Sequence, residues 1–137
     1  MTETSFVLYR SETDLAPGSD AALELVATAR RVNAQFGNTG FLHHEEGFFF
    51  QWLEGKPEPM SLICGRIERD PRHFAMTYLL QGTRHSRQFS DWDMGYSTGS
   101  LGSILTWLAD HSVSPRDKTA FAAAVLEFLQ HQSVALA

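Results

Sequence analysis

The sequence has little of what several large classes of protein require, beginning with cysteine. Cys64 is the single cysteine among 137 residues, so no disulfide can form within the chain. No apolar run reaches the roughly 20 residues that cross a bilayer. The amino terminus also lacks the basic segment and apolar stretch of a signal peptide. These absences predict a cytoplasmic protein without a membrane association.

Basic residues are also scarce. The chain has 11 Lys and Arg against 16 Asp and Glu, which gives a net charge of -5 at pH 7. Proteins that bind nucleic acid concentrate positive charge, because it neutralises phosphates and releases counterions. The charge balance therefore argues against nucleic acid as a partner and against an electrostatic anchor on a membrane.

Motifs of the common enzyme and metal-binding classes are missing as well. There is no GxSxG, P-loop, GxGxxG, HExxH or CxxC. Of the 6 histidines, only His43 and His44 are close in sequence. Neighbours on a strand point to opposite faces, so these two cannot bind one metal ion together. We interpret the histidines as surface imidazoles and predict no metal site.

The carboxylate pairs and the cysteine favour structural roles over catalytic ones. Glu45 and Glu46 fall in a turn between two strands, where solvated charge is expected, and Glu68 with Asp70 falls at a helix end before a proline. Cys64 lies on the apolar stripe of a helix, which indicates a buried small side chain rather than a nucleophile. The sequence thus predicts no enzyme of the conventional hydrolase, NTPase or dinucleotide-binding classes.

What the chain does have is an excess of aromatic residues, 12% with 10 Phe, in a length that fits one domain. Apolar periodicity first predicts a strand at 5–10 and a helix from Ser19 or Asp20 to Phe36, which Gly37 stops. Strands at 40–44 and 48–55, a helix at 56–70 and strands at 74–81 and 92–96 follow. The last elements are helices at 101–109 and 116–131, separated by a break at 112–115. The order βαββαββ predicts an α+β fold, in which a ferredoxin-like mixed sheet carries two helices on one face. The two C-terminal helices either cover the second face or form a subunit interface.

The strand at 48–55 is apolar on both sides, which predicts a central position in the sheet. Alternation places Phe49, Gln51 and Leu53 on one side and Phe48, Phe50 and Trp52 on the other. In the strand at 92–96, the same alternation puts Trp92, Met94 and Tyr96 on one face.

Three polar residues stand where apolar ones are expected. Tyr9 lies near the end of the first strand, Asn33 lies on the inward stripe of the first helix, and Gln51 lies between Phe49 and Leu53. A buried amide costs a few kcal/mol unless its donors and acceptors are paired. Their convergence on one sheet face indicates the polar edge of a bound ligand, such as a flat heteroaromatic ring held between the helices and the strand. The alternative, that each residue bonds the local backbone, stays open.

Five motifs in the same order then point to a known family. They are residues 8–11 (LYRS), 32–34 (VNA) with 37–40 (GNTG), 49–55 (FFQWLEG), 66–67 (RI) with 69–73 (RDPRH), and 89–95 (FSDWDMG). With these motifs, residues 5–96 strongly resemble the BLUF domain, the family of blue-light sensors that use FAD. The resemblance implies the ferredoxin-like sheet, with the isoalloxazine ring of the flavin held between the first two helices.

The resemblance also implies roles for individual residues. Tyr9 matches the tyrosine that donates an electron and a proton to the photoexcited flavin. Gln51 matches the glutamine between that tyrosine and the flavin, whose hydrogen bonds rearrange by rotation, tautomerisation or both to give the red-shifted signalling state. Asn33 matches the asparagine that bonds the pyrimidine edge of the flavin.

Further positions match the rim of the family's binding site and its route of signalling. Those that line the far edge of the ring and the ribityl-phosphate entrance are Arg66, Asp70, Arg72 and His73. Trp92 and Met94 match the pair on the fifth strand whose rearrangement near the glutamine passes the signal outward, and which of the two lies beside Gln51 stays open.

Two positions depart from the family pattern. Asn38 stands where Ile or Leu is usual, next to the ring pocket, where it adds a flavin contact or shifts the absorption. Val32 replaces a polar residue that often precedes the pocket asparagine, so a secondary hydrogen bond near the ring is missing. Neither change touches Tyr9 or Gln51, and we expect the photochemistry to survive.

The resulting prediction is a short stand-alone photoreceptor, with a flavin-binding sensory domain at 1–97 and a two-helix extension at 98–137. Its cofactor is FAD, with FMN or riboflavin as substitutes, and it is not an enzyme. The signal passes through the fifth strand and the C-terminal helices to a partner protein or a homo-oligomer. The stripe Phe121, Val125 and Phe128 is the candidate surface, with packing against the sheet as the alternative. Two other functions remain open, a small flavin-dependent redox enzyme and an interaction module without flavin.

Overall fold

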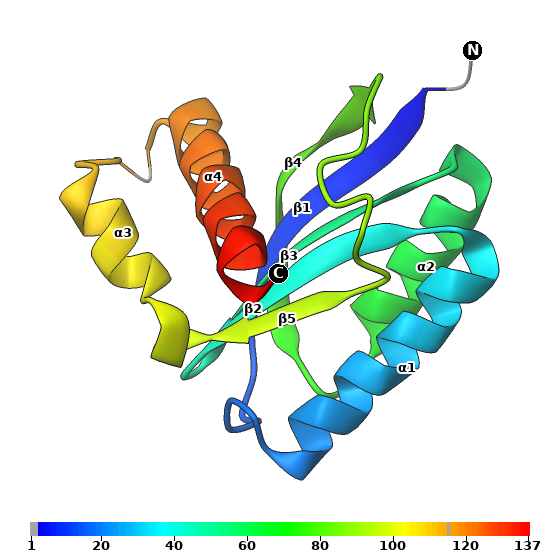
Figure 1. Ribbon diagram of the computed structural model, residues 1–137, viewed down its shortest axis with the longest axis horizontal. Coiled ribbons are helices and arrows are strands. Elements are labelled where there is room, and N and C mark those ends of the chain that lie inside the picture. The colour runs from blue at the N-terminus through cyan, green and yellow to red at the C-terminus, as the bar shows by residue number, and fades with distance from the viewer. Residues whose placement is uncertain (1–2, 115) are drawn as a thin grey trace.

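The computed structural model describes residues 3–114 and 116–137, and within this part of the chain five strands form one mixed sheet (Figure 1). The strands are β1 (Thr4–Glu12), β2 (Thr39–Glu45), β3 (Phe48–Gly55), β4 (Phe74–Arg84) and β5 (Gly95–Thr98). Their order is β4-β1-β3-β2-β5, with β5 parallel to β2 and the other neighbours antiparallel. The α+β ferredoxin-like fold is confirmed, and so is the central position of β3.

Helices lie on both faces of the sheet. On one face are α1 (Asp20–Phe36) and α2 (Pro57–Arg69), as Figure 1 shows. A short 3-10 turn η1 (Gly99–Leu101) and α3 (Ile104–Asp110) lead to α4 (Lys118–Leu136), which crosses the other face. None of the helices in residues 3–114 and 116–137 is long and apolar enough to span a membrane.

The ends of α1 follow from its flanking residues. The Ser19 hydroxyl accepts a hydrogen bond from the Ala22 amide at 3.2 Å, which satisfies one of the free donors of the first turn. Gly37 adopts a left-handed conformation with φ 70°, which costs glycine little, and ends the helix. Asn33 therefore lies in the last turn of α1, and the chain enters β2 two residues after the glycine.

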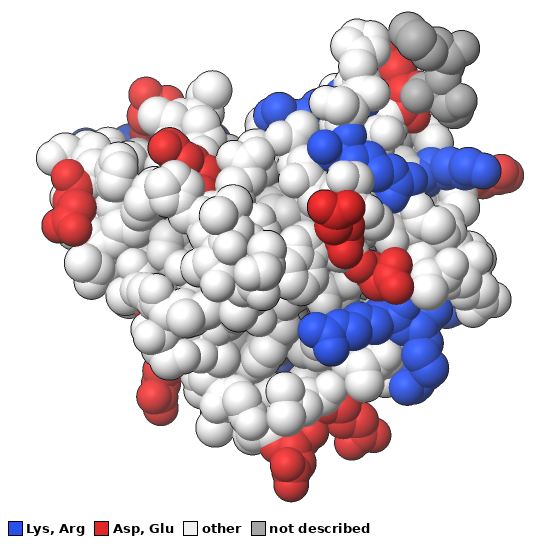
Figure 2. Space-filling view, in the orientation of Figure 1, with Lys and Arg blue, Asp and Glu red and all other residues white. Residues whose placement is uncertain are grey.

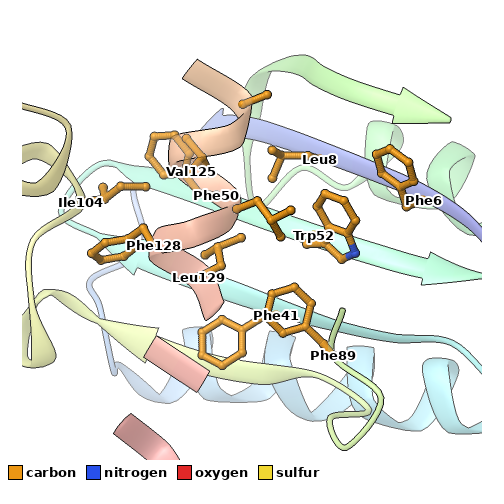
Figure 3. Packing of buried hydrophobic residues seen from close by; sticks show 12 residues of the cluster. Phe6, Leu8, Phe41, Phe50, Trp52, Phe89, Ile104, Val125, Phe128 and Leu129 are labelled. Carbon is orange, nitrogen blue, oxygen red and sulfur yellow. The ribbon is translucent and has the colours of Figure 1, made fainter. Parts of the chain in front are cut away.

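Each face of the sheet has its own hydrophobic core. The core under α1 and α2 contains Val7, Val26, Leu42, Phe49, Leu53, Met60, Ile63, Cys64 and Met94. The core under α4 is shown in Figure 3 and contains Phe6, Leu8, Phe41, Phe50, Trp52, Phe89, Ile104, Val125, Phe128 and Leu129. The stripe of α4 thus packs on the sheet, with Val125 and Phe128 buried and Phe121 partly buried.

Several predicted boundaries were wrong. The last strand begins at Gly95 rather than at 92 and continues to Thr98, because the carbonyls of Asp93 and Met94 are bonded to side chains of α1 and residues 92–94 lie outside the strand. Helix α3 begins only at Ile104, where Ser103 caps its first turn, and α4 runs from Lys118 to Leu136. Pro115, the last residue of the predicted break, lies outside the described residues.

The interpretation of the histidines as surface groups was right for His85, His111 and His131, which are exposed, but wrong for the other three and for Glu45. His43 and His44 are fully buried, and Glu45 and His73 are buried as well. His43 and His44 do point to opposite faces, since His43 packs edge-on against Phe128 in one core and His44 against Phe49 in the other. Periodicity alone does not show that these polar groups are paired inside the protein.

Candidate functional site

A cavity of about 220 Å³ lies between the sheet and the helices α1 and α2. Its walls are mainly apolar, with Val32 on α1, Leu42 on β2, and Ile63 and Ile67 on α2. The residues predicted to bind a cofactor all contribute to this lining, namely Tyr9, Asn33, Gln51, Arg66, Asp70, Arg72 and His73. The fold thus brings together seven side chains that are spread over more than sixty positions of the sequence.

Tyr9, Gln51 and Met94 form a hydrogen-bonded chain on the cavity side of the sheet. Tyr9 on β1 and Gln51 on β3 are direct cross-strand partners, so their side chains share a face. The Tyr9 hydroxyl donates to Oε1 of Gln51, and Nε2 of Gln51 donates to the Met94 sulfur at 3.4 Å. Both ends of the Gln51 amide are therefore occupied, the oxygen by a donor and the nitrogen by an acceptor.

The three members of this chain are almost completely shielded from solvent. The exposed fractions are 3% for Tyr9, 5% for Gln51 and 1% for Met94. Burial raises the pKa of the Tyr9 phenol well above its ordinary value of 10.0, with a smaller contribution from nearby Cys64. The phenol therefore keeps its proton throughout the physiological pH range and stays a hydrogen-bond donor to Gln51.

Two side chains of α1 hold the backbone that carries Met94. Asn33 donates through Nδ2 to the carbonyl of Asp93 at 2.6 Å, and Arg30 donates through Nε to the carbonyl of Met94 at 2.9 Å. The two residues are three positions apart on the helix, so they project from the same side. The sequence pointed to Asn33 but not to Arg30. The one indication for Arg30 was its position three residues before Asn33, on the same side of the helix.

Charged residues lie at the end of the cavity formed by α2 and the loop after it. Arg72 bonds both carboxylate oxygens of Asp70, with Nη2 to Oδ2 at 2.7 Å and Nε to Oδ1 at 2.9 Å. These hydrogen bonds hold the pKa of Asp70 below its ordinary value and raise that of Arg72. Arg66, one turn before Asp70, adds a second guanidinium to the lining. Asp70 offsets the charge of Arg72, and the second guanidinium of Arg66 leaves this end with an excess of positive charge, which favours an anionic group such as a phosphate.

His73 forms a fixed part of the wall. Its Nε2 donates to the carbonyl of Ile67 at 2.6 Å, and its Nδ1 is 2.8 Å from the hydroxyl of Ser11. The ring therefore joins the end of α2 to β1, and it stands 6.1 Å from the ring of Tyr9 between centroids. In the part of the chain that the structure describes, no three His, Cys, Asp or Glu side chains gather where they could hold a metal ion.

The structure separates Trp92 from Met94, contrary to the prediction that both point to one face. Met94 lies beside Gln51 in the cavity wall, whereas Trp92 packs edge-on against Phe41 at 5.9 Å on the α4 side of the sheet. The alternation failed because residues 92–94 lie outside β5, with the carbonyl of Trp92 bonded to the Gly40 amide and those of Asp93 and Met94 bonded to Asn33 and Arg30. Met94 is thus the member of the pair that contacts Gln51.

The two positions that depart from the family pattern have different surroundings. Val32 lines the cavity. Asn38 is buried, with an exposed fraction of 1%, but it does not line the cavity. Within residues 3–114 and 116–137, neither the Nδ2 nor the Oδ1 atom of Asn38 has a hydrogen-bond partner. The amide packs against Gly55, where a Cβ atom would collide with it. Direct contact of Asn38 with a ligand in the cavity is therefore not part of this geometry.

A ferredoxin-like sheet with an apolar slot under two helices, closed by a phenol and two amides, defines a domain whose cavity fits a flat ring with a polar edge. Comparison with known proteins gives the particular family. A family model described as sensors of blue-light using FAD (BLUF) matches residues 5–95. The chain therefore belongs to the BLUF family of flavin-binding blue-light sensors, and it is a photoreceptor of that family.

Curated relatives share about half of this chain. It is 38% identical over 74 residues to photoactivated adenylate cyclase subunit beta of Euglena gracilis, which is 54% of this chain and 8% of that protein. It is 39% identical over 66 residues to the blue light- and temperature-regulated antirepressor BluF of Escherichia coli (strain K12), which is 48% of this chain and 16% of that protein. The chain thus matches only a small part of each relative.

Solved structures match nearly the whole chain. The dark-state structure of BlrB, a BLUF protein, superimposes with a TM-score of 0.75 at 25% identity and covers 94% of this chain and 99% of its own. The photo-activated state of BlsA gives a TM-score of 0.70 at 21% identity and covers 90% of this chain and 94% of its own. The second likeness shows the shared fold alone.

Proposed function

We propose that blue light drives the loss of an electron and a proton from Tyr9 in this protein, and that Gln51 then changes its hydrogen-bond partners to form a signalling state. The observation that carries this proposal is the buried chain from the Tyr9 hydroxyl through the Gln51 amide to the Met94 sulfur. It connects a redox-active phenol with a segment that leads into β5 at the sheet edge.

The lining of the cavity fits a flavin. Apolar side chains from α1, α2 and the sheet suit the faces of an aromatic ring, and the polar atoms of Asn33 and Gln51 suit its heteroatoms. Arg66 and Arg72 suit the phosphates of FAD, and FMN or riboflavin would still meet the same ring-binding residues. When bound, a flavin supplies absorption of blue light and, once excited, a strong oxidant.

Tyr9 is suited to give up an electron and a proton together. Its phenol is protonated because burial raises its pKa, and its proton is already directed to Oε1 of Gln51. An oxidised phenol is a strong acid, so the proton would leave along this hydrogen bond to Oε1 of Gln51, and the electron and, through the Gln51 amide, the proton would be taken up by a bound flavin. Gln51 is thus the first residue to respond to the change at Tyr9.

Gln51 is suited to act as a switch because its amide has a donor and an acceptor of similar size. If the two ends exchange, Oε1 faces the sulfur of Met94 in place of Nε2. A thioether sulfur only accepts hydrogen bonds, so the contact at 3.4 Å becomes unfavourable. The Met94 side chain must then move or lose its partner, which changes the segment before β5.

A second polar network connects β5 with the C-terminal helices. Ser97 on β5 bonds Nδ1 of His43 at 2.7 Å, and Nε2 of His43 bonds Glu45 at 2.8 Å. Glu45 accepts from the Ser103 hydroxyl at 3.0 Å and from the Ile104 amide at the start of α3. We propose that this network relays a shift of β5 to α3, and that the output of this non-enzymatic sensor reaches a partner protein or a second copy.

The proposal is tested by absorption spectra before and after blue illumination of the purified protein with flavin. We expect a reversible red shift of the flavin band, and we expect Gln51→Leu and Tyr9→Phe to lose it. Tyr78→Phe is the matched control, because Tyr78 is the cross-strand neighbour of Tyr9 on β4 but bonds Glu68 outside the cavity.

Other outcomes identify the alternatives. A flavin band that only bleaches, or a shift that survives in Gln51→Leu, would overturn the switch. Steady oxidation of a nicotinamide by the flavin-loaded protein would favour a redox enzyme instead. A protein that stays colourless with added FAD would favour an interaction module without flavin.

A further inference from the structure

Arg30 holds the residue on which the proposed switch acts. Its Nε donates to the backbone carbonyl of Met94 at 2.9 Å, from a position on the helix α1. The sulfur of the same methionine accepts from Gln51 at 3.4 Å. Met94 is thus fixed at its backbone by Arg30 and at its side chain by Gln51.

We propose that Arg30 is a positioning residue for the photoreaction, which keeps the Met94 sulfur opposite Nε2 of Gln51 and stabilises the dark arrangement against displacement of β5. This inference rests on the proposed function, since it concerns the lifetime of the signalling state. It assigns the role to a side chain outside the cavity lining, one helical turn before Asn33.

The surroundings of Arg30 agree with this role. Within residues 3–114 and 116–137, its guanidinium forms no salt bridge with a carboxylate, and its hydrogen bond crosses from α1 to the segment before β5. Among the same described residues, the side chain of the next residue, Arg31, bonds only to Thr28 on its own helix, with Nη2 of Arg31 3.2 Å from the Thr28 hydroxyl. Of these two adjacent arginines on α1, Arg30 bonds the segment before β5 and Arg31 bonds its own helix.

The segment itself has little freedom once Arg30 holds it. Asn33 fixes the carbonyl of Asp93, and Gly95 follows directly, where a Cβ atom would collide with the ring of Phe41. Phe41 is itself fully buried. A displacement of Met94 must therefore break its bond to Arg30 or carry α1 with it, so the strength of that bond enters the free-energy difference between the two arrangements.

The experiment compares Arg30→Ala, Arg30→Lys and the control Arg31→Ala with the wild type. The first measurement is the rate of dark recovery after blue light. The second is hydrogen exchange of the backbone amides at 94–98 in the dark, in flavin-free and flavin-loaded protein. The third is the midpoint of thermal unfolding, which reports any general loss of stability.

We expect Arg30→Ala to slow dark recovery about fivefold and to speed exchange at 94–98 by a similar factor, because a hydrogen bond from a charged donor is lost at a partly exposed site. Arg30→Lys should restore part of both effects, because an ammonium can still donate to the carbonyl. Arg31→Ala should match the wild type in both measurements, and the midpoint of thermal unfolding of Arg30→Ala should fall by only the few degrees that one lost hydrogen bond explains.

Two results would overturn the role of Arg30 while leaving the proposed function intact. The first is an Arg30→Ala protein that recovers and exchanges like Arg31→Ala. The second is faster exchange over the whole sheet with a midpoint of unfolding lowered by more than one hydrogen bond explains, which would indicate a general structural role. Failure of the proposed function is recognised separately, because the wild type itself would then show no light-induced shift.

Discussion

At the scale of single residues, the site depends on polar side chains that have a hydrogen-bond donor as one partner and an acceptor as the other. Gln51 faces a donor with its oxygen and an acceptor with its nitrogen, so one orientation of the amide satisfies both ends. His44 is held in a comparable way, by the Tyr96 hydroxyl at Nδ1 and the Leu15 carbonyl at Nε2. Side chains held by two different partners are pre-organised, which a light-driven exchange requires.

Asn38 differs from these residues, because within the described part of the chain its buried amide has no hydrogen-bond partner, and this leads to a prediction about stability. Replacing it in Asn38→Leu should raise the free energy of unfolding by about 1–2 kcal/mol, because a buried amide without partners within residues 3–114 and 116–137 is removed and a side chain of similar size remains. Urea denaturation of both proteins measures the difference.

The control for this prediction is Asn38→Ala, which also removes the amide but leaves a cavity and should be less stable than Asn38→Leu. If Asn38→Leu is less stable than the wild type, the amide of Asn38 has a partner such as a buried water molecule.

The sequence identified the buried polar residues that interrupt an apolar pattern. It did not identify the buried polar residues that lie among other polar residues. Tyr9, Asn33 and Gln51 stand out because each interrupts a run of apolar positions. His43 and Glu45 did not, because the local pattern of a polar residue is the same whether its partner is water or another buried side chain. Arg30 resembles any exposed arginine until the chain folds.

At the scale of elements, Glu54 holds together three segments around the site. Its buried carboxylate accepts hydrogen bonds from Thr39 and Trp52, and from the backbone amides of Gln88 and Phe89, at 2.8 to 2.9 Å. The last two donors lie in the connection between β4 and β5 that carries Trp92 and Met94. Glu54 thus anchors the segment that the proposed switch displaces.

Glu54→Gln should therefore lower the free energy of unfolding by about 2–4 kcal/mol, since an amide nitrogen cannot accept and would face backbone donors. Because the connection is released, trypsin should also cut more rapidly at Arg84 and Arg87. Glu58→Gln, an exposed change on α2, is the control. If both variants are equally stable and equally resistant, Glu54 does not hold the connection.

The elements themselves were predicted with different success. The pattern of long segments such as α1 and β3 was clear, because α1 repeats a helical apolar period over seventeen residues and β3 is a largely apolar run of eight residues. The four residues of β5 are too few for a period, and the segment before them is shaped by contacts with α1, which lie sixty positions away. Such a boundary depends on tertiary structure rather than on local sequence.

At the scale of the whole molecule, the sheet separates a cavity under α1 and α2 from a hydrophobic core under α4. The helix α4 has two charged residues, Lys118 and Glu127, and Figure 2 shows few charged side chains over its C-terminal part and β5.

Both faces of the sheet contain a buried histidine on β2, His43 toward α4 and His44 toward α1. The pH dependence of folding therefore reports on both cores.

Burial lowers the pKa of His43 and His44 below the ordinary value of 6.5, despite the hydrogen bond of His43 to Glu45. As the pH falls below 6.5, the unfolded chain takes up protons that the native protein does not, so the free energy of unfolding falls, by at most about 1.4 kcal/mol per pH unit for each histidine.

Urea denaturation between pH 7.5 and about 5.5 measures this slope. It should be shallower in His43→Gln and unchanged in the exposed control His85→Gln. A stability that stays constant over this range would mean that both histidines are charged as readily inside the protein as in the unfolded chain, which their burial on the two faces of the sheet argues against.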